Sequence, residues 1–331
     1  MIDFHLGRYA LGVCVATAML AGCGGTQPPI AATGANVAHV RQASSSGNDL
    51  LYIRVGRYLV EILTYPGLSH VQDFGVQGAQ GGFCSDSGGD VFITGYDYNH
   101  GAGYIDEYAH GGTTPIATLH EEATFPNYCS VDPTAGTLAV ANGQSNVAIF
   151  HAAKGRPKYY RVSGFQKYGA LAYDGQGNLF ITGSNIQARK KELAELPKGS
   201  SRFTSITMKN VPSITGLQWD GKYLAFLVHR NAYATVDRVE VSGSTGKVVG
   251  VTRFEGTEQE SGGRCECAFW IEGGDVVLPA GWSKRLGNNQ QLDVWNYPAG
   301  GNPVTAVTLA GRWIFGGLTV SVAPSGPRIH R

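Results

Sequence analysis

The stretch that most constrains this chain is LAYDGQGNLFITG, residues 171–183, in which two apolar runs flank a short glycine-rich loop. Runs of this kind, joined by a Gly/Asn/Asp loop, predict a β-hairpin. The first of the two strands ends in an aspartate, and comparable strands recur along the chain. The aspartates that end them are Asp86, Asp132, Asp174 and Asp220. The chain is therefore expected to consist of repeats of one hairpin-based unit.

A second marker follows the same repeat, namely a later strand that leads into a Gly-rich turn. The marker residues are Tyr65, Tyr108, Phe150, Leu196, Val241 and Tyr297, spaced 43, 42, 46, 45 and 56 residues apart. Four short strands with their turns need about 40–45 residues, the length of one β-propeller blade. The spacing predicts six blades, at residues 49–79 completed by 315–323, 80–126, 127–165, 166–212, 213–256 and 257–312. A seventh blade within residues 255–300 is an alternative that the spacing leaves undecided. Two packed β-sandwiches would fit the strand content but not the spacing.

The two markers are offset along the chain. The later-strand marker appears at Tyr65 before any inner strand, and the last inner strand, near Leu318, follows the last marker. The first blade is therefore expected to receive its inner strand from the chain's C-terminal end. Such a closure removes the open edges that a ring of sheets would otherwise leave.

Composition agrees with an all-β chain. Glycine makes up 47 of 331 residues, charged residues are 15% and aromatic residues 10%. This mixture suits many short strands joined by tight turns. The formal net charge of +1 gives no electrostatic reason to expect a nucleic-acid partner.

The N-terminal segment is expected to be a targeting signal. Residues 9–20 are apolar, too short to span a bilayer, and run into LAGC at 20–23. This resembles the bacterial lipobox, in which the chain is cleaved before the cysteine, here Cys23, and the cysteine is lipidated. Gly24 favours the outer membrane by the same resemblance. The alternative is a buried first strand or helix with a chance cysteine.

These patterns divide the chain into four parts: a lipoprotein signal peptide at 1–22, a flexible tether at 23–48, the propeller at 49–323 and a tail at 324–331. The tether is rich in small and polar residues, Pro, Gly and Ser. The expected mature protein is anchored to a membrane by lipid and faces the periplasm or the exterior.

The hairpin at 171–183 and the turn YPAGGNP at 297–303 resemble those of bacterial extracytoplasmic propellers of the NHL-repeat and gluconolactonase-like group. The resemblance covers about 270 residues and implies a six-bladed β-propeller of four-stranded antiparallel blades. It implies little about activity, because propellers host many functions. In gluconolactonase-like enzymes, acidic and Asn residues in the central channel bind a metal, and no counterparts can be placed on this sequence.

The repeated aspartates and the cysteines are the next candidates for chemistry. A ring of carboxylates could bind Ca²⁺, but an Asp at a strand end is more typical of a turn. Disulfides and buried free thiols are both compatible with an even number of cysteines in an exported chain. These cysteines are Cys84, Cys129, Cys265 and Cys267. A Cys84–Cys129 bridge between facing blades is conceivable, and a zinc site is less compatible with Cys-x-Cys spacing.

The connections between the second and third strand of each blade carry aromatic, basic and amide side chains, which suit a ligand or protein surface. The predicted ligand-binding residues are Tyr96, Asp97, Tyr98, His100, Arg189, His229, Arg230, Tyr233, Trp282 and Arg285. The basic members favour an anionic partner. Residues 189–195 could alternatively form a helical turn, and all of these connections could be ordinary solvated loops.

The leading hypothesis is a non-enzymatic binding or scaffold module for a protein or glycan, without a cofactor. Neither a metalloprotease motif nor a nucleophile elbow occurs in the sequence. The alternative is a metal-dependent hydrolase or lyase of the gluconolactonase-like kind, and a third reading is a structural component of the envelope.

Overall fold

The computed structural model describes ten segments of the chain. They are residues 48–56, 58–121, 125–143, 146–185, 190–208, 214–230, 233–257, 268–282, 290–309 and 314–325. The chain divides into two units, 1–39 and 40–331, and the described residues all belong to the second. The predicted signal peptide and Cys23 lie outside the described residues. Within the described segments, no helix combines the length and apolar character needed to cross a membrane.

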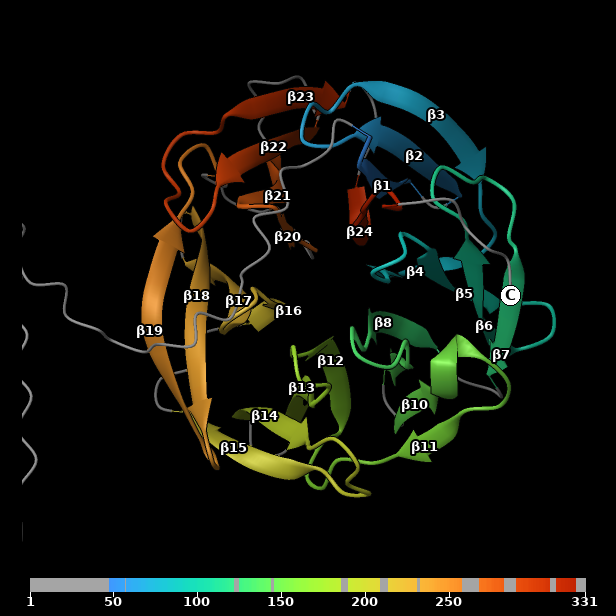
Figure 1. The fold of residues 1–331 in the computed structure, drawn as a ribbon, viewed down its shortest axis with the longest axis vertical. Helices are drawn as coiled ribbons and strands as arrows, with labels where there is room; N and C mark the ends of the chain where they lie inside the picture. Colours follow the sequence, from blue (N-terminus) through green and yellow to red (C-terminus); the bar gives the residue numbers. More distant parts are fainter. Residues whose placement is uncertain are drawn as a thin grey trace, which may run out of the picture. The chain divides into compact units, whose positions relative to one another are not determined.

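The described residues form an all-β propeller arrangement of small antiparallel sheets (Figure 1). One sheet has the order β24 (Ile314–Ser321), β1 (Leu50–Val55), β2 (Leu59–Thr64), β3 (His70–Gly75). The next contains β4 (Ala79–Ser85), β5 (Val91–Asp97), β6 (Ala102–Tyr108) and β7 (Ala117–Glu121). A third contains β8 (Pro126–Val131), β9 (Leu138–Asn142), β10 (Asn146–Phe150) and, after the short 3₁₀ turn His151–Ala153, β11 (Lys158–Tyr160).

A longer sheet of eight strands follows. Its first half is β12 (Lys167–Tyr173), β13 (Leu179–Asn185), β14 (Lys190–Leu196) and β15 (Thr204–Met208). Its second half is β16 (Ile214–Trp219), β17 (Leu224–Arg230), β18 (Tyr233–Ser242) and β19 (Thr245–Arg253). The halves meet where β15 and β19 pair in parallel through two residue pairs, Thr207–Thr245 and Met208–Gly246. The last sheet contains β20 (Trp270–Glu272), β21 (Asp275–Trp282), β22 (Gln290–Asn296) and β23 (Thr305–Leu309).

Two expectations about individual strands can be checked directly. The C-terminal strand β24 pairs antiparallel with β1, with Leu318 opposite Ile53, so the predicted docking of the chain's end beside its first strands is confirmed. A helical turn at residues 189–195 is wrong, because Lys190–Leu196 pairs along its whole length with β13. Seven cross-strand pairs satisfy the backbone groups that a helical turn would have bonded locally.

The core lies between neighbouring sheets, whose apolar faces pack on one another. Between the β16–β19 half-sheet and the β20–β23 sheet, Phe254 and Trp295 are fully buried with their ring centroids 5.2 Å apart. The indole of Trp295 donates a hydrogen bond to the Glu255 carbonyl at 3.2 Å. Burying one large apolar side chain contributes about 1.5–3 kcal/mol, so each inter-sheet cluster holds its two neighbours together.

The repeated aspartates end the inner strands as turn residues. In each, one carboxylate oxygen accepts backbone N–H groups of the following turn at 2.6–2.9 Å. Asp86 accepts from Gly88 and Asp90, Asp132 from Thr134, Asp174 from Gln176 and Asn178, and Asp220 from Lys222 and Tyr223. The turn role is therefore confirmed for these four carboxylates.

Candidate functional site

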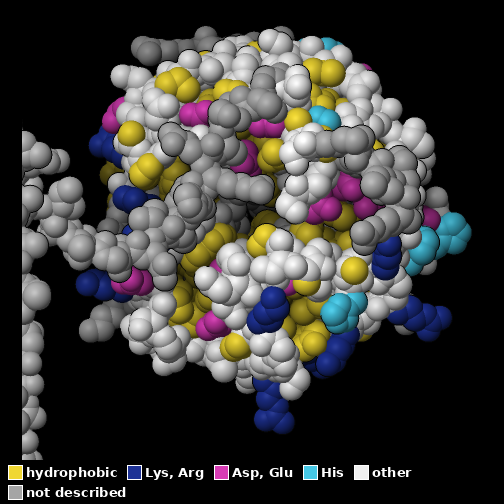
Figure 2. Space-filling model, in the orientation of Figure 1, with side chains coloured by type: hydrophobic (Ala, Val, Ile, Leu, Met, Phe, Trp, Pro, Cys, Tyr) yellow, Lys and Arg dark blue, Asp and Glu magenta, His cyan; other side chains and the backbone are white. Residues whose placement is uncertain are grey.

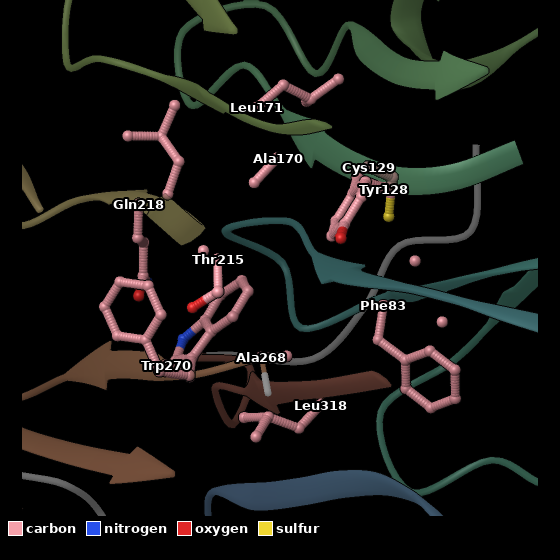
Figure 3. Close-up of a pocket in the computed structure, with 15 residues that line it drawn as sticks. Phe83, Tyr128, Cys129, Ala170, Leu171, Thr215, Gln218, Ala268, Trp270 and Leu318 are labelled. Carbon is pink, nitrogen blue, oxygen red and sulfur yellow. The ribbon is translucent and has the colours of Figure 1, made fainter. Parts of the chain in front are cut away.

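The inner strands surround a narrow central cavity of about 60 Å³. In Figure 1, β4, β8, β12, β16, β20 and β24 lie nearest the centre of the ring. Figure 3 shows side chains of these strands, and Ala268 just before β20, around this cavity. The labelled residues are Phe83, Tyr128, Cys129, Ala170, Leu171, Thr215, Gln218, Ala268, Trp270 and Leu318. The Gln218 amide is occupied, since it bonds both backbone groups of Ile271 at 2.7 and 3.1 Å.

This central lining does not fit a divalent cation. Among the described residues that line the cavity, none is Asp, Glu or His. Hard cations prefer carboxylate oxygens and zinc prefers thiolate or imidazole, whereas the cavity offers mainly rings, methyl groups and one amide already in use. No group of three or more His, Cys, Asp and Glu side chains occurs among the described residues either.

A disulfide links two inner strands beside the cavity. Cys84 of β4 and Cys129 of β8 are bonded, with their Cα atoms 5.7 Å apart. This is the pairing across facing sheets that the sequence left open. Both residues are buried within one apolar cluster. Cys265 and Cys267 lie outside the described residues.

A far larger hollow lies between the β3–β4 connection and the β5–β6 hairpin. This groove has a volume of about 1050 Å³. Four predicted ligand-binding residues line it, namely Tyr96, Asp97, Tyr98 and His100. Its other walls come from Tyr58, from residues 75–78, and from side chains of β6 and β7.

Two glycines create the shape of the groove. Cross-strand partners Gly95 and Tyr104 face each other in β5 and β6, and a Cβ on Gly95 would lie 2.2 Å from the Tyr104 ring. The ring therefore lies flat over Gly95 and its hydroxyl donates to the Gln77 carbonyl. Gly78 has φ +64°, and its carbonyl accepts the Tyr96 N–H at 2.9 Å. Glycine permits both close approaches because it has no side chain.

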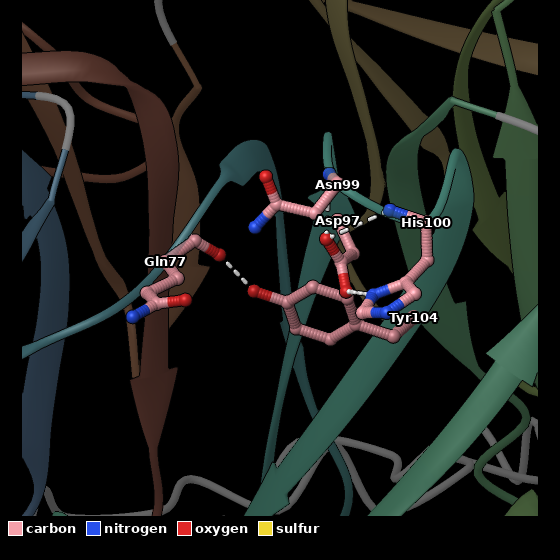
Figure 4. A network of polar contacts seen from close by, with 5 residues as sticks. All are labelled: Gln77, Asp97, Asn99, His100 and Tyr104. Carbon is pink, nitrogen blue, oxygen red and sulfur yellow. Dashed lines mark hydrogen bonds and ion pairs between the residues drawn. The ribbon is translucent and has the colours of Figure 1, made fainter.

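The tip of the β5–β6 hairpin carries a compact polar network (Figure 4). The Asp97 carboxylate contacts His100 Nδ1 at 2.5 Å and accepts the backbone N–H of Asn99 at 2.8 Å. The hydrogen bond from the His100 ring lowers the pKa of Asp97, and the same contact raises the pKa of His100. The imidazole is well exposed, so this ion pair stands at the rim of the groove.

A second carboxylate lies deeper in the groove. Asp106 accepts a hydrogen bond from the Thr118 hydroxyl at 2.6 Å, and partial burial raises the pKa of its carboxyl group. The Thr118 hydrogen bond and, to a smaller extent, His120 oppose this rise in pKa, and His120 lies on β7 opposite Tyr104. Burial, with smaller effects from Asp106 and Asp97, raises the pKa of Tyr104 to about 12. Both carboxylates therefore act electrostatically on the Tyr104 hydroxyl.

Aromatic rings form the remaining surface of the groove. Tyr96 stacks on Phe125 with centroids 4.0 Å apart and meets Tyr98 edge-on at 5.1 Å. Tyr98 is 70% exposed and Tyr58 is 65% exposed. The Tyr98 hydroxyl accepts a hydrogen bond from the Gln80 amide at 3.1 Å. Large rings held in place yet open to solvent are typical of binding surfaces.

The predicted residues of the β17–β18 hairpin belong to a different region, and their side chains mainly contact other residues of the fold. Arg230 Nη2 lies 2.6 Å from the buried carboxylate of Asp237. The Tyr233 ring is covered by the Arg253 guanidinium at 4.1 Å. His229 Nε2 is buried without a hydrogen-bond partner among the described residues, and burial lowers the pKa of this imidazole.

The other predicted residues are not placed. Arg189 and Arg285 lie outside the described residues, and Trp282 ends β21 without a described side chain. Figure 2 shows Lys and Arg side chains of the described residues scattered mostly along the rim of the visible face.

Sequence reasoning missed Tyr104, Asp106 and His120 as groove residues. A usable signal was present in β6, where Tyr104, Asp106 and Tyr108 alternate with residues of the opposite face. A second signal was Gly95, a glycine inside an otherwise β-rich run, which indicates a close approach of another group.

Comparison with known proteins informs the fold. No family model matches the chain and no curated protein sequence does. Among solved structures, the chain is similar to one titled "Crystal structure of Nidogen/Laminin Complex", with a TM-score of 0.59 and 13% identity. The match covers 83% of this chain and 98% of that chain. At this identity the likeness shows a shared β-propeller fold and carries no ligand or activity with it.

Proposed function

We propose that this protein is a six-bladed β-propeller that acts as a binding or scaffold module, with the groove at the β5–β6 hairpin as its ligand site. Each half of the eight-stranded sheet counts as one blade, because the halves share two residue pairs while each is a complete antiparallel set of four strands. The observation that carries the proposal is the groove itself, where Tyr96, Asp97, Tyr98 and His100 meet. Concave sites that combine aromatic walls with a few fixed polar groups are the usual form of ligand sites.

We also propose that the chain is a lipoprotein of the cell envelope, anchored through Cys23 to the outer membrane and facing the periplasm or the exterior. The LAGC sequence at 20–23 motivates the anchor. The Cys84–Cys129 disulfide supports an extracytoplasmic location, because disulfides persist in oxidising compartments. Mass spectrometry of the mature N-terminus tests the anchor: a diacylated or triacylated cysteine supports it, and an intact residue 1 contradicts it.

A protein or glycan ligand fits this reading. The matched structure is, by its title, a complex of nidogen with laminin, so a propeller of this fold is seen there within a protein complex. The gluconolactonase-like alternative has weaker support, because the central lining of the described residues lacks carboxylates. A stoichiometric divalent ion together with turnover of a lactone panel would favour that alternative over the binding module.

The test of the binding module compares the full chain with a Tyr98→Ala, Tyr104→Ala double variant. Both proteins are immobilised and exposed to cell-envelope proteins and glycans, and circular dichroism verifies that both are folded. A ligand retained by the wild type is expected to be lost by the variant. A ligand that both proteins retain equally would place binding elsewhere and contradict the groove assignment.

A further inference from the structure

The charge of the groove narrows the class of its ligand, on the premise that the groove is the binding site proposed above. Among the described residues that line it, two are carboxylates, Asp97 and Asp106, and none is Lys or Arg. The remaining polar groups are tyrosine hydroxyls, amides, threonine hydroxyls and two imidazoles. A cationic ligand would therefore meet two carboxylates there, one of them paired with His100, whereas an anionic ligand would meet no Lys or Arg among the described lining residues.

The aromatic walls favour a cation as well. A guanidinium or ammonium group over a tyrosine face is attracted by the ring's quadrupole, and a nearby carboxylate adds a charge-assisted hydrogen bond. Tyr98 and Tyr58 present exposed rings, while Tyr104 lies within electrostatic range of both carboxylates. These rings and acids come from the β1–β2 turn, the β5–β6 hairpin and β6, so the groove offers a cationic ligand contacts from several elements.

The geometry leaves both carboxylates able to accept more hydrogen bonds. A carboxylate has about four acceptor positions. Among the described residues, Asp97 receives bonds from the backbone N–H groups of Asn99 and His100 and from the His100 ring, and Asp106 receives a bond from the Thr118 hydroxyl. Arginine forms bidentate pairs with carboxylates, which makes it the best-matched side chain for such a site.

We propose that the groove binds an extended protein segment that presents arginine or lysine side chains. The volume of about 1050 Å³ admits several side chains rather than a single ion. The proposed ligand is cationic, whereas the basic residues of the other connections predicted an anionic partner. Of those, Arg230 is already neutralised by Asp237.

The experiment measures binding of a synthetic peptide by the full chain, using fluorescence anisotropy at low salt. The peptide carries two arginines among Gly and Ser residues, and its matched control carries citrulline, which has the same shape without the charge. The wild type is expected to bind the arginine peptide and not the citrulline peptide. Asp97→Asn and Asp106→Asn should each weaken binding about tenfold, while Asp73→Asn, at an exposed acid of β3 that does not line the groove, should leave it unchanged.

Three outcomes overturn the assignment or separate it from the proposed function. Equal binding of arginine and citrulline peptides would overturn the cationic class. A neutral glycan or peptide that is lost in Tyr98→Ala, Tyr104→Ala but retained by Asp97→Asn and Asp106→Asn would keep the groove as the site and overturn only its charge preference. Arginine-peptide binding that no groove variant changes would overturn both the inference and the assignment of the groove as the binding site.

Discussion

Two hairpins at equivalent positions in their sheets, β5–β6 and β17–β18, contain the same kinds of side chain and use them differently. Each pairs an aspartate with a basic residue: Asp97 with His100, and Asp237 with Arg230. In the first hairpin the pair stands in solvent at the rim of a groove. In the second hairpin, Asp237 is only 2% exposed, and Arg230 is engaged in an ion pair with this buried carboxylate.

The difference shows that residue type alone does not identify a binding surface. Thr235 completes the second network, since its hydroxyl accepts a hydrogen bond from Arg230 Nε at 3.2 Å and donates to Asp237 at 3.0 Å. A charge whose partners are all internal offers little to a ligand, and removing its partner would leave it buried and uncompensated. The β5–β6 hairpin keeps unused acceptors and an exposed ring beside an open groove, so its polar groups remain able to bind.

The largest expected effect comes from breaking the ion pair between Arg230 and the buried Asp237. Arg230→Ala leaves the Asp237 carboxylate buried without a cation, and we expect it to lower the free energy of unfolding by about 3 kcal/mol. Chemical denaturation measures this. Adding Asp237→Asn to Arg230→Ala removes the uncompensated charge and should recover most of the loss. Equal instability of the single and double variants would contradict the assignment of Arg230 as the partner that makes this burial tolerable.

A second buried acid sharpens the same point. Asp293 on β22 is 2% exposed, its Oδ1 receives no hydrogen bond from the described residues, and burial raises the pKa of its carboxyl group to about 7. Between about pH 4 and pH 7 the folded state holds a proton that the unfolded chain has lost, so this group lowers stability as pH rises through that window.

Asp293→Asn remains neutral throughout that window. We expect the variant to be more stable than wild type by about 2 kcal/mol near pH 8 and equal to it near pH 4. Thermal unfolding at the two pH values measures the difference. A stability gain that is independent of pH would show that packing, rather than the charge, is responsible.

The third effect alters the groove without touching its charges. A Cβ on Gly95 would overlap the Tyr104 ring, so Gly95→Ala must displace that ring from β5 and from the Gln77 carbonyl. We expect a loss of about 1 kcal/mol in stability, at the low end for overpacking, together with loss of groove binding. Gly175→Ala, at a turn that does not line the groove and where a Cβ meets only one atom within 4 Å, serves as the control.

Much of this fold could be predicted because it depends on local and periodic signals. The turn aspartates and the spacing of the later-strand marker indicate where strands begin and end, and the offset of the markers indicates that β24 joins β1. The groove could be predicted only in part. Tyr96 to His100 are adjacent in sequence and therefore visible as a group, whereas Tyr104 and His120 join them through cross-strand pairing.

The ion pair between Arg230 and Asp237 could not be predicted from the sequence for the same reason. The two residues are seven positions apart and meet because β17 and β18 form a hairpin of fixed register. A sequence shows that an arginine is present in a connection but not which carboxylate faces it. Charge counted along the chain therefore predicted an anionic partner, while charge counted in the folded groove favours a cationic one.

The smallest effect concerns the exposed pair. Because the pKa of His100 is raised by Asp97, the contribution of His100 to stability is present below about pH 6.5, the ordinary histidine value, and is lost as pH rises through its folded pKa. The pKa of Asp97 is lowered, so its own contribution is lost as pH falls through that value. Both side chains are charged only at pH values between the lowered pKa of Asp97 and the raised pKa of His100. NMR titration of the His100 ring should show its pKa falling toward the ordinary value in Asp97→Asn, and no shift would contradict the contact.

The same titration predicts the behaviour of the groove. The ionisable side chains of its lining are Asp97, Asp106, His100, His120 and the tyrosines. Protonated His100 offsets part of the negative charge of the carboxylates, so arginine-peptide affinity should increase as pH rises through the raised pKa of His100. In His100→Gln this increase should be smaller, because the variant lacks that imidazole. An affinity that instead falls with rising pH would mean that the ligand's own charge, and not that of the groove, governs binding.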